Sequence, residues 1–250
     1  SKEGGTYGWT NGEVAGSLIG TRDIDSMVPV SKKNNASWNR ISQEKAKVVS
    51  TKMYKKSKTV TSSLVDSYAW DTILQWYEKT AKVNGTTIDC KNSTNYGNYF
   101  DTPFGASANS SGEKTNKISL KNVLYAVHKL QLTPWKWTEY DLEYHYLPTE
   151  ANSEKSEMNG IRTVCEIATG SSDYTKVNNI YDMAGNMYEW TTEVRDYKNS
   201  SDETGMFAVL RGGSFDYRGD SYPVSIRHGY NHADVYSVNI GFRVVLYITM

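Results

Sequence analysis

Cysteine is scarce in this chain of 250 residues, which contains only Cys90 and Cys165. The two lie far apart in the sequence and form no Cys-x-x-Cys motif. Such a pair could form one disulfide, but we expect two buried free thiols.

The chain also has no net charge, because its 28 Lys and Arg residues balance 28 Asp and Glu residues. No global field therefore draws it to nucleic acid or to anionic lipid. No apolar run approaches the roughly 18 residues of a membrane span, and no signal peptide is visible. We expect no nucleic-acid partner and no membrane insertion. The sequence begins at Ser1, which leaves open that it is a fragment of a longer protein.

Lysine and glutamate are missing after Glu203, although both are common before it. Both lose much side-chain entropy when they are held in one conformation, and the cores of interfaces contain few of them. The stretch 216–239 is instead rich in Tyr, Ser, Asp, Asn, His, Gly and Arg. Tyrosine offers a large rigid surface, around which Ser, Gly and Asn adapt their hydrogen bonds. This composition is typical of a binding face; a Tyr-rich surface loop without a binding role is the alternative.

We interpret residues 1–250 as a single domain, because no internal repeat or linker divides the chain and its length amply supplies a core. Residues 86–119 show little periodicity and predict a long loop region, held by buried aromatic residues such as Tyr96 and Tyr99. A short strand is expected over 14–19, where an N-terminal strand can pair with the C-terminal one.

Helical spacing of apolar residues predicts three helices. The first covers 42–56 and begins at Ser42, a good N-cap residue. The second covers 67–83, carries an aromatic stripe and ends at Asn84-Gly85. The third is expected over 120–130.

Three short motifs follow one another towards the C-terminus: Asn186-Met187-Tyr188-Glu189-Trp190, Arg211-Gly212-Gly213-Ser214 and Gly241-Phe242-Arg243. In this order they resemble the motifs of the formylglycine-generating enzyme (sulfatase-modifying factor) family. The resemblance is firm over 179–246 and loose over 42–83. It implies an α+β, C-type-lectin-like fold, with a twisted antiparallel sheet, two main helices and much irregular loop.

The motifs suit a structural role in such a fold. Gly212, Gly213 and Gly241 permit tight backbone turns. Arg211 and Arg243 are expected to bind loop carbonyls or acidic groups rather than a ligand. The apolar positions expected to alternate in and out along core strands are Trp190, Ile240, Phe242, Val244 and Leu246.

The enzyme activity of this family requires cysteines near the C-terminus, shortly after the Arg-Gly-Gly-Ser turn. Here that context is Arg227-His228-Gly229-Tyr230, and no cysteine follows Cys165. A thiolate is the nucleophile and copper ligand of that chemistry, and imidazole cannot replace its sulfur. The related sulfoxide synthases bind nonheme iron through a His-rich helical domain, whereas this chain has four histidines and no helical His-x-x-x-His pair. We expect no enzyme activity and no redox cofactor, with a divergent metal-dependent oxidase as the least favoured alternative.

The variable proteins of diversity-generating retroelements, from gut bacteria and prophages, are the relatives that the sequence resembles most. They place a hypervariable stretch between an Arg-Gly-Gly-Ser turn and a terminal Gly-Phe-Arg strand, which corresponds to about 211–246 here. Adenine-directed mutagenesis of Asn-type codons yields Tyr, Asp, Ser, His and Asn, the residues that crowd 216–239. Pro223, Val224, Ile226 and Val238 are expected to support this face. The predicted contact residues are Asp216, Tyr217, Asp220, Tyr222, Ser225, Arg227, His228, Tyr230, Asn231, His232, Asp234, Tyr236 and Asn239.

The resemblance also implies a structural calcium ion at the Gly-Asn-x-x-Glu-Trp turn. Its ligands correspond to Asp182, the carbonyl groups of Gly185 and Met187, and Glu189. Two carboxylates and two carbonyls suit a hard cation. The alternative is that Asp182 and Glu189 only cap backbone amides of the turn.

The sequence therefore predicts a non-enzymatic binding module that presents a diversified, Tyr-rich face to a protein or glycan on a cell or phage surface. We expect the chain itself at a cell surface, secreted or on a phage particle. A fixed carbohydrate-binding lectin is the alternative, because Tyr and Trp faces stack on sugars while Asp, Asn and Glu bind their hydroxyl groups. The sequence leaves the ligand and the oligomeric state open.

Overall fold

The computed structural model describes residues 27–31, 33, 37–83, 85–99, 123–128, 163–167, 169–170, 172–198, 204–237 and 239–248. For 123–128, 163–165, 197–198, 204 and 230–231 it describes the backbone alone. The α+β, C-type-lectin-like fold expected from the sequence is confirmed.

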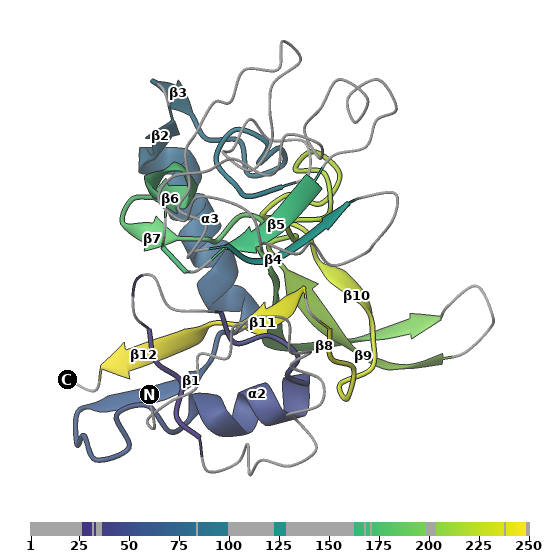
Figure 1. Ribbon diagram of the computed structural model, residues 1–250. Helices are drawn as coiled ribbons and strands as arrows, with labels where there is room; N and C mark the ends of the chain where they lie inside the picture. Colours follow the sequence, from purple (N-terminus) through teal and green to yellow (C-terminus); the bar gives the residue numbers. More distant parts are fainter. Residues whose placement is uncertain are drawn as a thin grey trace, which may run out of the picture.

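A four-stranded sheet of order β10-β9-β8-β11 lies at the centre (Figure 1). β8 and β9 form a long antiparallel hairpin that begins with Glu189 opposite Arg211, and a register shift follows Trp190. β10 extends the hairpin antiparallel to β9, whereas β11 lies parallel to β8, with Ile240 opposite Tyr188. The strand bounds are Tyr188–Lys198 (β8), Thr204–Arg211 (β9), His228–Asn231 (β10) and Ile240–Phe242 (β11).

The C-terminal segment contributes strands to two sheets. After β11 the chain leaves the central sheet at Arg243 and continues as β12 (Val244–Ile248), which pairs antiparallel with β1 (Val60–Leu64). Figure 1 shows β1 and β12 side by side next to α2. The strand expected over 14–19 lies outside the described residues.

The helix α2 (Gln43–Ser50) begins as the sequence predicts. The Ser42 hydroxyl accepts a hydrogen bond from the Lys45 amide at 3.3 Å, and Ala46 and Val49 are buried against β1 and β8. The predicted end near residue 56 is wrong. Turns follow Ser50, because the hydroxyl of Ser62 in β1 donates to the Met53 carbonyl at 2.7 Å and holds the chain in a reversal.

The helix α3 (Ser67–Thr80) carries the predicted stripe, in which Trp70, Leu74 and Tyr77 are buried. Its N-cap is Asp66, whose carboxylate accepts from the Ala69 amide at 2.7 Å. The predicted end at residue 83 is wrong, because β2 (Lys82–Val83) pairs with β3 (Thr86–Thr87). Gly85, at φ 81°, serves this hairpin turn rather than a helix end.

The third predicted helix is also wrong, because residues 123–128 form a strand. β4 (Val123–His128) pairs antiparallel with β5 (Thr163–Ile167). Its Val, Tyr and Val residues favour extended backbone, and a distant partner strand outweighs the helical spacing of the apolar residues. The remaining short elements are η3 (Asp173–Thr175), β6 (Lys176–Val177) and β7 (Ile180–Tyr181).

Two hydrophobic clusters stabilise the fold. One surrounds α3 and includes Tyr96 and Tyr99, so both aromatic residues hold their loop as predicted. The other lies between α2 and the central sheet and contains Trp190 and Ile240. The core prediction for Leu246 is wrong, because this side chain is 43% exposed on β12. Neither described helix combines the length and apolar character needed to cross a membrane.

Candidate functional site

Asn186 ties three segments together beneath the stretch 216–239. Its side-chain oxygen accepts hydrogen bonds from the Asn98 amide group and the Ile167 backbone amide, each at 3.0 Å. Its side-chain nitrogen donates to the Ile167 carbonyl at 3.1 Å, and its own carbonyl accepts from the Phe215 amide. Asn186 has φ 62°, a conformation that Asn tolerates better than most residues. The motif residue therefore fixes where the stretch begins.

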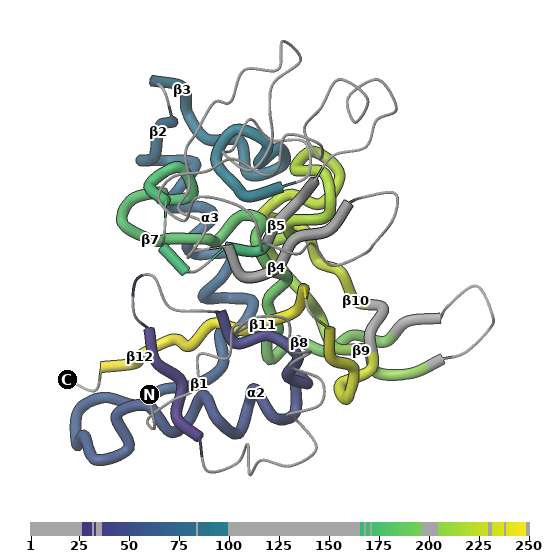
Figure 2. The backbone as a smooth tube through the Cα atoms, in the orientation of Figure 1, coloured from purple at the N-terminus to yellow at the C-terminus, as the bar shows by residue number. Residues whose placement is uncertain are grey.

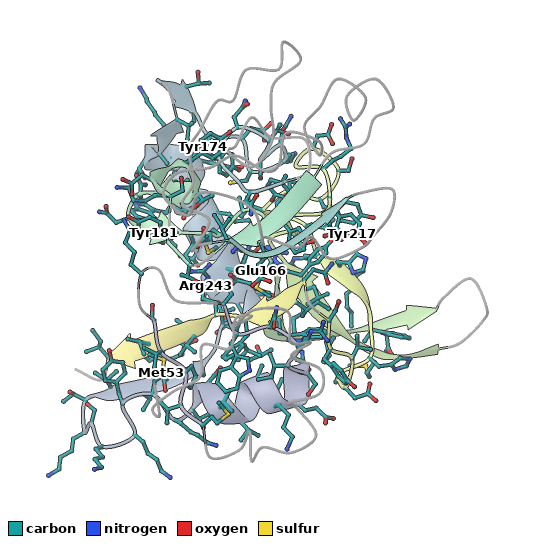
Figure 3. All side chains as sticks on the ribbon, viewed as in Figure 1. Met53, Glu166, Tyr174, Tyr181, Tyr217 and Arg243 are labelled. Atoms are coloured by element: carbon teal, nitrogen blue, oxygen red, sulfur yellow. The ribbon has the colours of Figure 1, made fainter. Side chains whose placement is uncertain are left out.

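Arg243 forms the second tie, near the centre of the molecule (Figure 3). Its guanidinium donates to both carboxylate oxygens of Glu189, at 2.9 and 2.7 Å. It also donates to the Tyr181 and Asp182 carbonyls, each at 3.1 Å. Burial raises the pKa of Glu189, and the adjacent guanidinium opposes that rise. The prediction that Arg243 binds an acid and loop carbonyls is confirmed.

The same contacts bear on the predicted calcium ion. Both oxygens of Glu189 are bound by Arg243, and those of Asp182 accept from the Thr175 hydroxyl at 2.6 Å and the Gly170 amide at 2.8 Å. The Gly185 carbonyl accepts from the Met187 amide at 2.7 Å. In this arrangement Arg243 neutralises one of the two carboxylates, and the oxygens of both already accept hydrogen bonds, which favours the alternative that Asp182 and Glu189 bind groups of the protein itself. Across the described part of the chain no group of three or more His, Cys, Asp or Glu residues is placed to hold a metal. The calcium ion stays a prediction.

The Arg211-Gly212-Gly213-Ser214 turn is the third tie. Arg211 is almost fully buried, forms an ion pair with Asp71 of α3, and lies 5.7 Å from the ring of Trp70. The internal role predicted for Arg211 is therefore confirmed. Gly213 has φ 73°, and a Cβ atom there would lie 2.2 Å from the Tyr222 carbonyl. The backbone can approach this closely only at glycine.

The stretch 216–239 leaves this frame as a coil and then enters β10. Figure 2 shows the coil next to that of residues 88–99. Ser93 joins the two, because its amide donates to the Gly219 carbonyl and its hydroxyl accepts from the Val224 amide, at 3.0 and 2.9 Å. The indole nitrogen of Trp70 donates to the Val224 carbonyl at 3.0 Å. The backbone of the stretch is thus fastened from two sides.

The predicted contact residues lie at the surface of the stretch. Wherever their side chains are described, none is buried. The exposed ones are Asp220, Arg227, His232, Asp234 and Tyr236, and the half-buried ones are Asp216, Tyr217, Tyr222, Ser225, His228 and Asn239. The side chains of Tyr230 and Asn231 lie outside the described set. Of the predicted supporting positions, Pro223 and Val224 are buried and Ile226 is half-buried, while Val238 lies outside the described residues.

Arg227 has partners within the fold. Its guanidinium pairs with Asp71 of α3 and with Glu193 of β8, the second at 3.3 Å. Asp71 thereby joins Arg211 of the motif turn to Arg227 of the predicted face. The side chain is still 44% exposed, so it can support the face and contact a ligand.

Four rings meet where the stretch crosses the central sheet, and we name Tyr188, Tyr217, Tyr222 and His228 the tyrosine cluster. Tyr217 and Tyr222 have ring centroids 4.4 Å apart, and Tyr188 lies 5.5 Å from Tyr217 and 5.6 Å from His228. Tyr188 is buried under the other three, which are half-buried. Tyr188 is not among the predicted contact residues, although it occupies a free position of the first motif, next to Glu189.

Cys90 is a buried free thiol, as expected. Burial, with Glu78 nearby, raises the pKa of this thiol to about 12, so it is protonated at neutral pH and a poor nucleophile. The side chain of Cys165 lies outside the described set.

The chain is similar to one protein-family model and to solved structures. The model of the sulfatase-modifying factor enzyme 1-like domain matches residues 107–248. Among solved structures, Treponema denticola variable protein 1 is similar at 15% identity, with 90% of this chain and 76% of that chain covered and a TM-score of 0.41. No curated protein matches the chain. Because the domain model covers more than half of its residues, the chain belongs to the family of sulfatase-modifying factor enzyme 1-like domains.

Proposed function

We propose that this chain is a non-enzymatic ligand-binding module whose contact face is the stretch 216–239. One observation carries the proposal: none of the predicted contact residues with described side chains is buried, while the segments around them are fixed. A surface of Tyr, Asp, His and Asn on a fixed backbone is what recognition of a macromolecule requires.

The contacts of the backbone reduce the entropic cost of binding. Val224 is held by Trp70 and Ser93, and the Ser225 amide donates to the Cys90 carbonyl at 3.3 Å. A loop that is ordered before it binds loses little conformational freedom when the ligand arrives. Affinity then depends mainly on which side chains the face presents.

The chemistry of the site supports binding rather than catalysis. In the context where enzymes of the family carry cysteine, Arg227 forms ion pairs and His228 packs in the tyrosine cluster. The other histidine of the face, His232, lies against the ring of Phe207 at 4.7 Å. No cysteine follows Cys165 in the sequence, so this end of the chain has no sulfur nucleophile.

We further propose that a retroelement diversifies the face and that its target is a protein or glycan on a cell or phage surface. The contact residues are of the types that adenine mutagenesis of Asn codons produces, and the ties at Asn186, Arg211 and Arg243 lie outside 216–239. Substitutions confined to the face therefore leave the residues that make these three ties in place.

A binding screen tests the proposed function. The 250-residue chain is applied to a glycan array and to a display library of surface proteins, beside Tyr217→Ala and, as a matched control, Tyr68→Ala on the exposed side of α3. Tyr68 is 88% exposed and lies outside the face. We expect a target whose binding is lost with Tyr217→Ala and kept with Tyr68→Ala. Equal binding by both variants would exclude the face, and glycan hits alone would favour the fixed lectin.

Deep sequencing of the gene across a population tests diversification separately. We expect substitutions concentrated in codons 216–239, at positions that correspond to adenine in the template. An invariant stretch would refute the diversification and leave a fixed binder.

A further inference from the structure

A surface pocket of about 380 Å³ lies outside the stretch 216–239, and we name it the hairpin pocket. Pockets that bind small molecules typically have volumes of about 300–1,000 Å³. The β2–β3 hairpin and the coil of residues 88–99 both contribute to the lining, which consists of Val83, Thr86, Thr87, Ile88, Asp89, Asn92, Asn95 and Tyr96. None of these residues belongs to the three motifs or to the predicted contact residues, so the proposed function does not use them.

The apolar side of the hairpin pocket is the outer surface of the core. Ile88 and Tyr96 are buried in the hydrophobic cluster around α3, and the half-buried Val83 packs against the same cluster. The Tyr96 hydroxyl donates to the Asp89 carbonyl and accepts from the Ser93 hydroxyl, each at 2.9 Å. The backbone around the pocket is therefore fixed before a ligand arrives, and binding costs little conformational entropy.

The polar side of the hairpin pocket is open to solvent. Its five polar residues are all exposed, and they are Thr86, Thr87, Asp89, Asn92 and Asn95. One carboxylate oxygen of Asp89 accepts from the Lys91 amide at 2.8 Å, and the side-chain oxygen of Asn92 accepts from the Thr94 amide at 3.1 Å. A hydroxyl group donates and accepts, a side-chain amide does both through separate atoms, and a carboxylate only accepts. The pocket thus offers both donors and acceptors beside an apolar wall.

The chemistry of the lining narrows the class of ligand. Among the described residues that line the pocket there is no Lys or Arg, so a phosphate or carboxylate ligand would gain no opposite charge. Asp89 is the single carboxylate of that lining, which leaves a divalent cation only partly neutralised. A wholly apolar ligand would cover polar groups without giving them hydrogen bonds. A sugar ring meets both sides of the pocket, because its hydroxyl groups donate and accept while the C–H groups of its faces are apolar.

We propose that the hairpin pocket binds a neutral pyranose unit of a glycan. One face of the sugar ring lies against the apolar side of the pocket, and the ring hydroxyl groups form hydrogen bonds with Asp89, Asn95 and Thr87. The inference goes beyond the proposed function, because it assigns a second, fixed site to residues outside 216–239. The two sites are neighbours, since the Ser93 amide in the coil of the pocket donates to the Gly219 carbonyl at 3.0 Å.

Titration with methyl glycosides tests the proposal. The methyl glycosides of glucose, galactose, mannose, fucose and N-acetylglucosamine are added to the 250-residue chain with ¹⁵N-labelled asparagine, and the side-chain amide signals are followed by NMR. We expect the Asn92 and Asn95 signals to move with at least one glycoside, with a Kd on the order of 1 mM. Tetrahydropyran-2-methanol keeps the ring but lacks the ring hydroxyl groups. It should bind about tenfold more weakly, because it forms none of their hydrogen bonds.

Variants locate the site. Asn95→Ala and Thr87→Val should each weaken binding of the glycoside by about fivefold, the effect of losing one hydrogen bond. Asp89→Asn keeps the shape and should weaken binding by about tenfold, because hydrogen bonds to a charged acceptor are stronger. All three residues are exposed, so an unchanged Tm is expected and separates loss of binding from loss of folding. The matched controls are Lys91→Ala, an exposed residue of the same coil that does not line the pocket, and Tyr217→Ala in the face, and both should leave the affinity unchanged.

The possible results separate the hairpin pocket from the face. No shift of either Asn signal at about 50 mM of any glycoside, roughly fifty times the expected Kd, overturns the sugar site, and so do equal affinities for the glycosides and the tetrahydropyran probe. Binding that Tyr217→Ala abolishes and Asn95→Ala keeps would place the sugar on the face and also overturn the pocket. A glycan from the binding screen that Tyr217→Ala still binds and Asn95→Ala does not would support the pocket. Failure of the pocket leaves the proposed function standing, since none of its residues lies in 216–239.

Discussion

Replacing Glu189 by Gln tests whether the Arg243 ion pair stabilises the fold. The substitution keeps the shape and one acceptor oxygen but removes the charge, so the guanidinium keeps its hydrogen bonds to the Tyr181 and Asp182 carbonyls and loses its counter-charge. The side chains are 25% exposed for Arg243 and 10% exposed for Glu189, so water compensates little.

Breaking a buried ion pair by removing one partner costs about 3–5 kcal/mol. Because the two carbonyls remain, we expect the lower end, about 3 kcal/mol. For a domain of this size that corresponds to a Tm about 6–12 °C lower. The loss should be seen as a lower midpoint in urea with an unchanged slope, followed by tryptophan fluorescence at pH 7.

Asp173→Asn is the matched control, because Asp173 pairs with Lys176 at the surface, at 3.5 Å. Exposed pairs contribute little, so no change in the midpoint is expected. A loss below about 1 kcal/mol for Glu189→Gln, within the range of an exposed pair, would refute the view that this pair holds the C-terminal segment in place.

Three further predictions concern buried groups of the frame. Burial raises the pKa of Glu166 from 4.5 to about 8, so the folded state holds the proton more tightly than the unfolded state. Stability should therefore fall as the pH rises from about 5 to 8 and level off above, and urea titrations of Glu166→Gln should lack this slope. Gly213→Ala should lower the free energy of unfolding by more than about 2 kcal/mol, because it adds a backbone clash to the strain of a positive φ. Gly85→Ala adds the strain alone and should cost about 1 kcal/mol. Equal losses of stability in the two variants would contradict the clash. Adding calcium in excess over EDTA should leave Tm unchanged, because Arg243 already pairs with Glu189 and both oxygens of Asp182 already accept hydrogen bonds. A rise in Tm that the substitution Asp182→Asn abolishes would show that the ion binds.

Local signals in the sequence were sufficient for the centres of both helices. The Ser42 cap and the stripe of Trp70, Leu74 and Tyr77 depend on residues within a few positions of each other. The ends of the helices and the conformation of residues 123–128 are instead decided by contacts with strands. Strand β5, which pairs with 123–128, lies more than thirty positions away, and no local pattern encodes such a partner.

The site divides in the same way. The motif spacing indicated which residues hold the ends of the stretch, and composition indicated which residues face solvent. The contact between Arg227 and Asp71 could not be predicted, because it joins the stretch to α3 through side chains far apart in sequence. Tyr188 could not be predicted as part of the face, because it lies among motif residues whose role is structural. Its contacts with Tyr217 and Tyr222 arise only when the stretch folds over β8.

The separation of frame and face explains how the chain can tolerate change where it binds. The ties at Asn186, Arg211 and Arg243 involve buried groups, whose loss costs several kcal/mol each. Exposed side chains such as Tyr236 and Asp234 contribute little to stability, so substitutions there usually stay within about 0.5 kcal/mol. The tyrosine cluster lies between these cases, because Tyr217 and Tyr222 pack on the buried Tyr188. Variation at these two positions is therefore limited to side chains that still cover Tyr188, and this requirement predicts that the centre of the face stays aromatic while its rim varies freely.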